Sequence, residues 1–249
     1  MGGGLSLGPM LNLRLARPKQ VIDIAGLAEL REVREEGGWI RIGAAVTHAE
    51  VEDGVHAPLR GGLLQSVAGG IAYRAIRNRG TLGGSLAHAD PAADWILTAV
   101  ALGAQIEIAA QAGTRRVPAD RFMQGAYTTA LAEVELLAAL WVPRLGADAR
   151  WGYAKFCRKT GEFAEASCAA VFDGERKLAR IVLGALDGAP QALPTLAAQV
   201  ARSGEAPARG AIEAAVSAAV PSQDAIDRKL RVAAVERCLG QVFMAEQVQ

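Results

Sequence analysis

Short runs of alternating apolar and polar residues dominate the first half of the chain. Because alternate side chains of a strand point to opposite faces, this pattern predicts strands at residues 19–24, 39–43, 104–109 and 114–117. Gln111, Ala112 and Gly113 separate the last two runs and are typical of a hairpin turn. We therefore expect residues 104–117 to form a pair of neighbouring strands.

Three stretches of this half carry the signals of helices. Thr47 and Glu50 form a capping-box pattern, which predicts the start of a short helix. Residues 58–68 are predicted to be helical until a glycine pair ends them. Residues 91–102 are predicted to form a helix with proline in its first turn. Asp94 lies in that turn, where the helix dipole alone favours a negative charge.

The second half of the chain changes from strands to helices. Residues 151–158, 164–172 and 178–186 are strand-like, and Asp173-Gly174 predicts a hairpin between the last two. These make a three-stranded antiparallel sheet. Alanine-rich helices follow, and the last is expected at about residues 224–246. Its apolar face would consist of Ile226, Leu230, Val235, Leu239 and Val242. Core packing and a subunit contact both remain open for this face.

The order of these elements predicts an α+β protein with two domains. A chain of 249 residues is long enough for one large domain or two ordinary ones. Pro143 and Gly146 mark a boundary. We therefore expect a mixed domain at residues 1–145, and a sheet with a C-terminal helical tail at residues 146–249.

Composition excludes several classes of protein. Lys plus Arg is 27 against 26 for Asp plus Glu, so the formal charge of +1 gives no basic surplus for nucleic acid. The most apolar run, residues 95–106, is too short to cross a bilayer. The start of the chain lacks the pattern of a signal peptide. We therefore expect a cytoplasmic protein without a membrane span.

Cysteine and histidine spacing indicates no metal site. Cys157, Cys168 and Cys238 are widely separated and form no C-x-x-C motif, which argues against a disulfide framework, zinc and an iron-sulfur cluster. Idle thiols of a reducing cytosol are the expected interpretation. The three histidines have no metal-ligand spacing, and we expect His88 to brace the loop in which it lies.

The stretch at residues 76–94 holds the candidate chemistry. Glycines around Thr81 let the backbone bend and approach a ligand closely, and free N–H groups in such a turn bind anions. The hydroxyls of Thr81 and Ser85 add donors, and Asp94 offers an acceptor for a sugar hydroxyl. We interpret the stretch as a pyrophosphate cradle. An ordinary tight turn remains the alternative.

A second glycine-rich segment opens the chain. Gly2, Gly3 and Gly4 precede Leu5 and Ser6. Two such segments, far apart in sequence, could clamp a diphosphate from both sides. Neither contains a Walker lysine or the G-x-G-x-x-G pattern of the usual dinucleotide fold.

Together the segments resemble the flavin loops of one family. The motif GGGLS followed by PMLNLR, and the motif TLGGSLAHADPAAD, are similar to the first and second loops of the FAD-binding medium subunit of molybdenum hydroxylases. That group includes aerobic carbon monoxide dehydrogenase and the xanthine dehydrogenase family. RKTGEFA, beginning at Arg158, resembles a third signature. The resemblance covers nearly the whole chain.

The resemblance implies a fold and a set of cofactor contacts. The fold would be a PCMH/VAO-type FAD-binding domain that lacks the family's N-terminal β-α-β unit, and residues 130–142 would supply the strand beside the flavin ring. Lys155 would lie beside the pyrimidine end of the ring and stabilise negative charge there. The implied FAD contacts are Gly2, Gly3, Gly4, Leu5, Ser6, Leu7, Thr81, Gly83, Gly84, Ser85, Ala87, Asp94, Leu137, Lys155 and Glu162. An ordinary core leucine at Leu137 and a surface ion pair for Lys155 and Glu162 stay open.

The resemblance also implies function and partners. Electrons would arrive from a large molybdopterin-binding subunit through a small 2Fe–2S subunit, and FAD would pass them to an acceptor such as NAD, oxygen or quinone. No residue of this chain would need to be a nucleophile or a general base. The alternatives are a structural or assembly subunit that lost FAD with its leading residues, and a stand-alone flavoprotein reductase.

Overall fold

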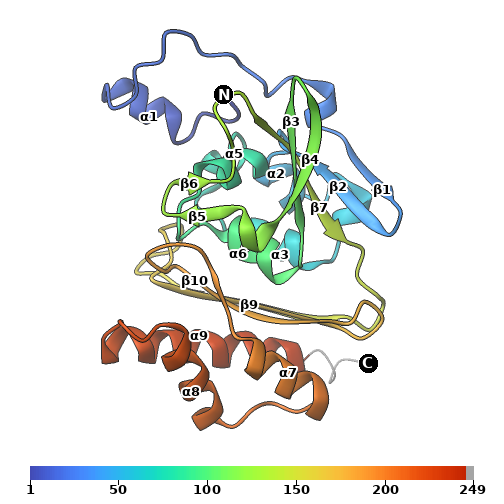
Figure 1. The fold of residues 1–249 in the computed structure, drawn as a ribbon, viewed down its shortest axis with the longest axis vertical. Helices are drawn as coiled ribbons and strands as arrows, with labels where there is room; N and C mark the ends of the chain where they lie inside the picture. Colours follow the sequence, from blue (N-terminus) through green and yellow to red (C-terminus); the bar gives the residue numbers. More distant parts are fainter. Residues whose placement is uncertain (245–249) are drawn as a thin grey trace.

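The computed structural model describes residues 1–244. Their elements form successive layers along the long axis of the molecule (Figure 1). A five-stranded sheet with short helices beside it occupies one end, a four-stranded sheet lies in the middle, and three helices close the other end. The mixed fold class that the sequence predicts is confirmed.

The first sheet is antiparallel, in the order β1-β2-β7-β3-β4. Its strands are β1 (Val33–Glu36), β2 (Trp39–Gly43), β3 (Gln105–Ala110), β4 (Gly113–Pro118) and β7 (Leu136–Pro143). The strands predicted at residues 39–43, 104–109 and 114–117 are thus confirmed. The strand predicted at residues 19–24 is wrong: this segment pairs with no strand and is largely exposed.

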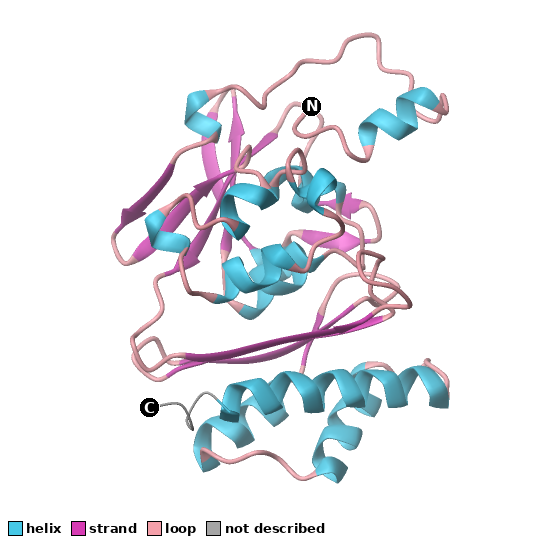
Figure 2. Cartoon of the chain, turned by 180° about the vertical axis from the view of Figure 1, so that it is seen from behind, coloured by secondary structure: helices cyan, strands magenta, loops and turns pink. Residues whose placement is uncertain are grey.

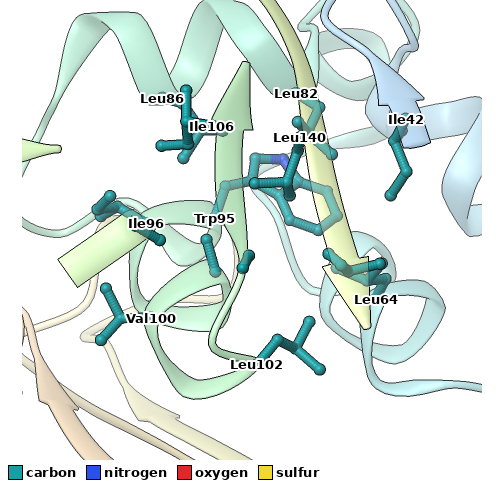
Figure 3. Close-up of a cluster of buried hydrophobic side chains, with 14 of the residues drawn as sticks. Ile42, Leu64, Leu82, Leu86, Trp95, Ile96, Val100, Leu102, Ile106 and Leu140 are labelled. Carbon is teal, nitrogen blue, oxygen red and sulfur yellow. The ribbon is translucent and has the colours of Figure 1, made fainter. Parts of the chain in front are cut away.

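Short helices pack beside this sheet and build the first core. They are α2 (His48–Glu52), α3 (Leu63–Gly69), α4 (Arg74–Arg77), α5 (Leu82–His88) and α6 (Asp94–Ala101). Trp95 lies at the centre of the cluster, surrounded by aliphatic side chains that include Leu64, Leu82 and Leu140 (Figure 3). The capping box at Thr47 is present as predicted.

The remaining short elements surround this part. They are α1 (Leu7–Asn12), η1 (Ala28–Leu30), η2 (Ala57–Leu59), η3 (Ala119–Arg121), β5 (Met123–Gly125) and β6 (Thr128–Thr129). The single helix predicted at residues 58–68 is divided into η2 and α3, because Gly61 between them has a φ of +70°. α1 buries no residue and stands away from the rest of the molecule, with the N-terminus close by (Figures 1 and 2).

The second sheet forms the middle layer and is covered on both faces. It contains β8 (Arg150–Phe156), β9 (Ala166–Asp173), β10 (Leu178–Gly184) and β11 (Gln191–Ala192), in the order β11-β10-β9-β8. Three strands were expected, and the two-residue β11 is an additional edge strand. Every residue of β9 is buried. Ala169 and Val171 join the first core, whereas Cys168 and Phe172 join a second core on the opposite face.

The helical tail covers that opposite face. It consists of α7 (Pro194–Ser203), α8 (Arg209–Ala219) and α9 (Ala225–Met244). Val235, Leu239 and Val242 are buried on α9 as predicted, but Ile226 is 78% exposed, so its assignment to the apolar face is wrong. Ile226 lies in the first turn of this helix. Glu246, at the expected end of this helix, lies outside the described residues.

The two sheets come from separate parts of the sequence. All strands of the first precede residue 145, and all strands of the second follow it. A boundary between independent domains at residue 145 stays a prediction. None of the helices in residues 1–244 has the length and apolar character that crossing a membrane requires.

Candidate functional site

The two glycine-rich segments meet at one cavity. It has a volume of about 480 Å³ and lies between the N-terminal segment, α5 and the start of α6. This volume is within the usual range of about 300–1,000 Å³ for ligand sites. Of the predicted contacts, the residues that line it are Gly2, Gly3, Gly4, Leu5, Ser6, Leu7, Thr81, Gly84, Ser85, Ala87 and Asp94.

Close backbone contact joins the two segments. A Cβ added to Gly3 would lie 1.8 Å from the carbonyl oxygen of Arg79, so only glycine fits here. A Cβ added to Gly2 would lie 2.8 Å from the Oγ1 of Thr81. The expectation that the segments face each other is therefore met by the structure.

The first segment presents free amide groups at this cavity. The N–H groups of Gly3, Gly4, Leu5, Ser6 and Leu7 donate to no acceptor within residues 1–244. The hydroxyl of Ser6 lines the same wall and makes no cap for α1. Unsatisfied N–H groups in succession are an anion-binding arrangement. The first segment therefore has the free backbone N–H groups that the sequence predicted for both glycine-rich segments.

The second segment differs from the expected open turn. It forms helix α5, whose N-cap is Thr81. The N–H of Leu82 donates to the carbonyl of Val46, that of Gly83 to Ala44, and that of Gly84 to the Oγ1 of Thr81. Because the fold itself uses these amides, the interpretation of the segment as a loop of bare amides is wrong. It contributes a wall with hydroxyls instead.

Gly83 has a packing role rather than a place on the cavity. A Cβ at this position would lie 2.4 Å from the Cβ and 2.7 Å from the Cα of Ala44. Gly83 is buried against Ala44, whereas Gly84 and Ser85 line the cavity. Gly83 thus lets α5 approach Ala44, and its contact with the cofactor stays a prediction.

Asp94 connects the cavity to the second sheet. Its Oδ1 accepts a hydrogen bond from the Tyr153 hydroxyl and one of 2.8 Å from Lys155 Nζ. Burial, and then the charge of Asp94, raise the pKa of Tyr153 well above its usual value, so the phenol stays a donor. No described residue donates to the Oδ2 of Asp94, which leaves this oxygen available to a ligand hydroxyl.

Besides Gly83, three residues assigned by resemblance do not line this cavity. Lys155 is occupied by Asp94 and by the carbonyl of Gly70, at 2.8 and 2.7 Å. Leu137 is buried in β7 among core side chains, as its alternative interpretation allowed. Glu162 is exposed and lines a separate surface hollow with Arg158 and Glu165, among others.

Several cavity residues were not among the predicted contacts, and of these only Met1, His48, Ile71 and Ala72 lie outside the stretches that the sequence singled out. The full set includes the N-terminal Met1 and Met10, and the later residues His48, Ile71, Ala72, Ile76, Gly80, His88, Asp90, Ala93 and Phe163. His88 ends α5 with its ring centroid 5.2 Å from that of Tyr127, so it both braces the segment, as expected, and faces the cavity.

Buried Arg77 shapes one wall of the cavity. Its guanidinium donates at 2.9 and 3.1 Å to the carbonyls of Ile71 and Ala72, and at 2.7 Å to both carboxylate oxygens of Glu52. The Arg77 hydrogen bond is the main cause that lowers the pKa of Glu52. Ala72 adopts a φ of +42°, which non-glycine residues rarely do. Arg77 therefore holds a strained turn in place beside the ligand space.

These residues fit a dinucleotide such as FAD. The amides at residues 3–7 suit the diphosphate, and the free oxygen of Asp94 suits a polyol hydroxyl. A ligand that contacts both walls of the cavity would depend on the close approach of the Gly3 backbone to Arg79. Among the described residues, no side chain that lines this cavity is positioned as a nucleophile beside a general base.

The first 145 residues match the family described as "FAD binding domain in molybdopterin dehydrogenase". The nicotine 6-hydroxylase medium subunit of Paenarthrobacter nicotinovorans is 36% identical over 197 residues, which cover 78% of this chain and 69% of the relative. The carbon monoxide dehydrogenase medium chain of Hydrogenophaga pseudoflava is 36% identical over 229 residues, or 90% of this chain and 80% of the relative.

Solved structures with the same fold span nearly the whole chain. A chain of quinoline 2-oxidoreductase from Pseudomonas putida 86 superposes with a TM-score of 0.84 at 31% identity, covering 98% of this chain and 89% of that one. A chain of carbon monoxide dehydrogenase from Hydrogenophaga pseudoflava gives a TM-score of 0.87 at 34% identity, covering 98% and 88%.

Proposed function

Because the chain belongs to the family of FAD-binding domains in molybdopterin dehydrogenases, we propose that it is the electron-transfer subunit of a molybdenum hydroxylase complex. Membership makes it a flavoprotein component of an oxidoreductase, with FAD as its cofactor. In the proposed reaction, electrons arrive from a small 2Fe–2S subunit beside a large molybdopterin-binding subunit. They leave for an external acceptor such as NAD, oxygen or quinone.

The meeting of the two glycine-rich segments at one cavity carries this proposal. When bound, FAD supplies redox chemistry that no side chain of the protein can supply. The residues of this chain bind and orient it. The free amides at residues 3–7 hold the diphosphate, and the Oδ2 of Asp94 accepts from a ribityl hydroxyl. Thr81 and Ser85 form the facing wall.

Lys155 acts on the cofactor through Asp94 in this proposal. Its ammonium binds the Oδ1 of Asp94, which leaves the other carboxylate oxygen of this cavity-lining residue free for the ligand. A direct contact of Lys155, Leu137 or Glu162 with the ring stays a prediction from the resemblance. The same is true of the cytoplasmic location, which the free thiols of Cys157, Cys168 and Cys238 favour.

The test begins with the purified chain alone. A bound flavin gives a yellow protein, and flavin fluorescence during titration of the apoprotein gives the Kd for FAD. Co-expression with the molybdopterin and 2Fe–2S subunits should then give a complex in which the substrate of the large subunit reduces the flavin. A colourless chain that still joins the complex would support the structural subunit instead. Reduction of an acceptor by the isolated chain, with no partner, would support the stand-alone reductase.

A further inference from the structure

Backbone contacts connect His48 to the start of α5, the helix that forms one wall of the cavity. It is the first residue of α2, directly after the N-cap Thr47. Its backbone N–H donates at 2.9 Å to the carbonyl of Gly80, and Thr47 forms a β-bridge with Thr81. The imidazole therefore keeps a fixed position relative to the start of α5.

The indole of Trp95 determines which nitrogen of His48 carries the hydrogen. Trp95 Nε1 donates to His48 Nδ1 at 2.9 Å, and both side chains are buried, with Trp95 only 1% exposed. An indole N–H can only donate, so Nδ1 must be the acceptor. In the neutral ring the hydrogen then sits on Nε2.

The Nε2 of His48, a residue that lines the cavity, is not completely buried by the protein. His48 lines the cavity, and its Nε2 lies beside Gly80, where an added Cβ would be only 2.8 Å away. Among residues 1–244, no acceptor takes the Nε2 hydrogen. Because Nε2 keeps some accessible surface, a ligand or water in the cavity can accept this hydrogen.

The ring is neutral at physiological pH. Burial is the main cause that lowers the pKa of His48, to about 4, and the nearby positive charge of Arg77 is the second. Arg77 is itself paired with Glu52. His48 thus offers one directed N–H whose state does not change near neutrality.

We propose that His48 Nε2–H binds a diphosphate oxygen of the dinucleotide, opposite the amides at residues 3–7. This inference rests on the proposed FAD function. Trp95 is the positioning residue, because it fixes both the tautomer and the direction of the ring. The cofactor's diphosphate would then be held by main-chain donors on one side and by a neutral side-chain donor on the other.

Two substitutions at His48 separate a donor from a space-filling ring. His48→Phe removes the donor, and we expect FAD affinity to fall about ten- to hundredfold, the usual value of one hydrogen bond to a charged group. His48→Gln keeps an N–H near the position of Nε2 and should stay within about threefold of wild type. His56→Phe is the matched control, since His56 does not line the cavity, and it should leave the Kd unchanged.

Three further readouts exclude a merely structural role. ADP, which keeps the diphosphate, should lose affinity for His48→Phe in parallel with FAD, whereas riboflavin should not. The Nε2–H signal of His48 in a ¹H–¹⁵N spectrum should shift when FAD binds. In Trp95→Phe the His48 ring should populate both neutral tautomers, so the hydrogen should no longer be confined to Nε2.

The outcomes distinguish the two levels of the argument. If the wild-type chain binds neither FAD nor ADP, the proposed function and this inference both fail. If wild type binds FAD and His48→Phe binds it equally well, with no shift of the Nε2–H signal, only the role of His48 is overturned. If His48→Phe fails to fold, the donor role is decided by His48→Gln and by the NMR shift in wild type.

Discussion

Replacement of Gly3 by alanine tests the contact between the two glycine-rich segments. The new Cβ would lie 1.8 Å from the carbonyl oxygen of Arg79, whereas ordinary contacts begin at 3.4 Å. One backbone must therefore retreat by 1.6 Å, the difference between these values. A shift of that size carries an amide out of hydrogen-bonding range of a ligand held on the opposite wall.

The loss can be expressed as a free energy. A hydrogen bond to a charged group contributes about 1.5–3 kcal/mol, so losing two costs about 3–6 kcal/mol, or about 10²- to 10⁴-fold in the Kd for FAD. Stability of the apoprotein should change by less than about 0.5 kcal/mol, because the helix that follows Gly3 buries no residue. Flavin fluorescence gives the Kd, and circular dichroism of the apoprotein gives the Tm.

Gly8→Ala is the matched control in the same segment. A Cβ at Gly8 has no atom within 4 Å, and alanine favours the helix in which Gly8 lies. This variant should bind FAD as wild type does. A Gly3→Ala protein with the wild-type Kd would refute the idea that close approach of the two backbones creates the site. Equal loss of FAD in both variants would show that the segment tolerates no added side chain at all.

Three other predictions follow from contacts of the described residues. Lys155→Met leaves the largely buried carboxylate of Asp94 without its ammonium, so urea unfolding should show a loss of about 3 kcal/mol together with weaker FAD binding; unchanged stability and a shift only in the reduction potential would instead favour direct contact with the ring. The pKa of His48 is about 4 when folded and 6.5 ordinarily, so the unfolded chain takes up the proton first as pH falls. Its contribution of about 3 kcal/mol is present above pH 6.5 and lost by about pH 4, and His48→Gln should flatten that part of the stability profile measured by denaturant titration. Ile181→Ala, in the fully buried face of the middle sheet, should cost about 2–5 kcal/mol, whereas Ile226→Ala at an exposed position should cost less than about 0.5 kcal/mol; equal effects on the Tm would contradict the layered packing.

Local signals in the sequence predicted most of the secondary structure. Alternation at residues 39–43 and 104–117 found strands of the first sheet, and the capping box at Thr47 found the start of α2, because these signals act within a few residues. The prediction of a strand at residues 19–24 was wrong because strand formation also depends on residues far away in the sequence. A strand needs a partner to pair with, and no nearby residue reveals that a partner is absent.

The candidate site was predictable in part. Glycine content and the polar residues beside it singled out both segments and Asp94, and the family resemblance assigned them to FAD; both segments and Asp94 contribute to one cavity. The helical state of the second segment was missed, because its first amides are satisfied by carbonyls of Ala44 and Val46, far away in the chain. The contact of His48 with Trp95 spans 47 residues and likewise leaves no local trace.

The position of the middle sheet, covered on both faces, has a consequence for how the protein can be cut and how it unfolds. The strand β9 supplies Val171 to one core and Phe172 to the other, so neither core is complete without it. Removing the C-terminal helices would expose a broad apolar face and should cause aggregation rather than release a trimmed flavin domain. The layers are therefore expected to melt in a single cooperative step.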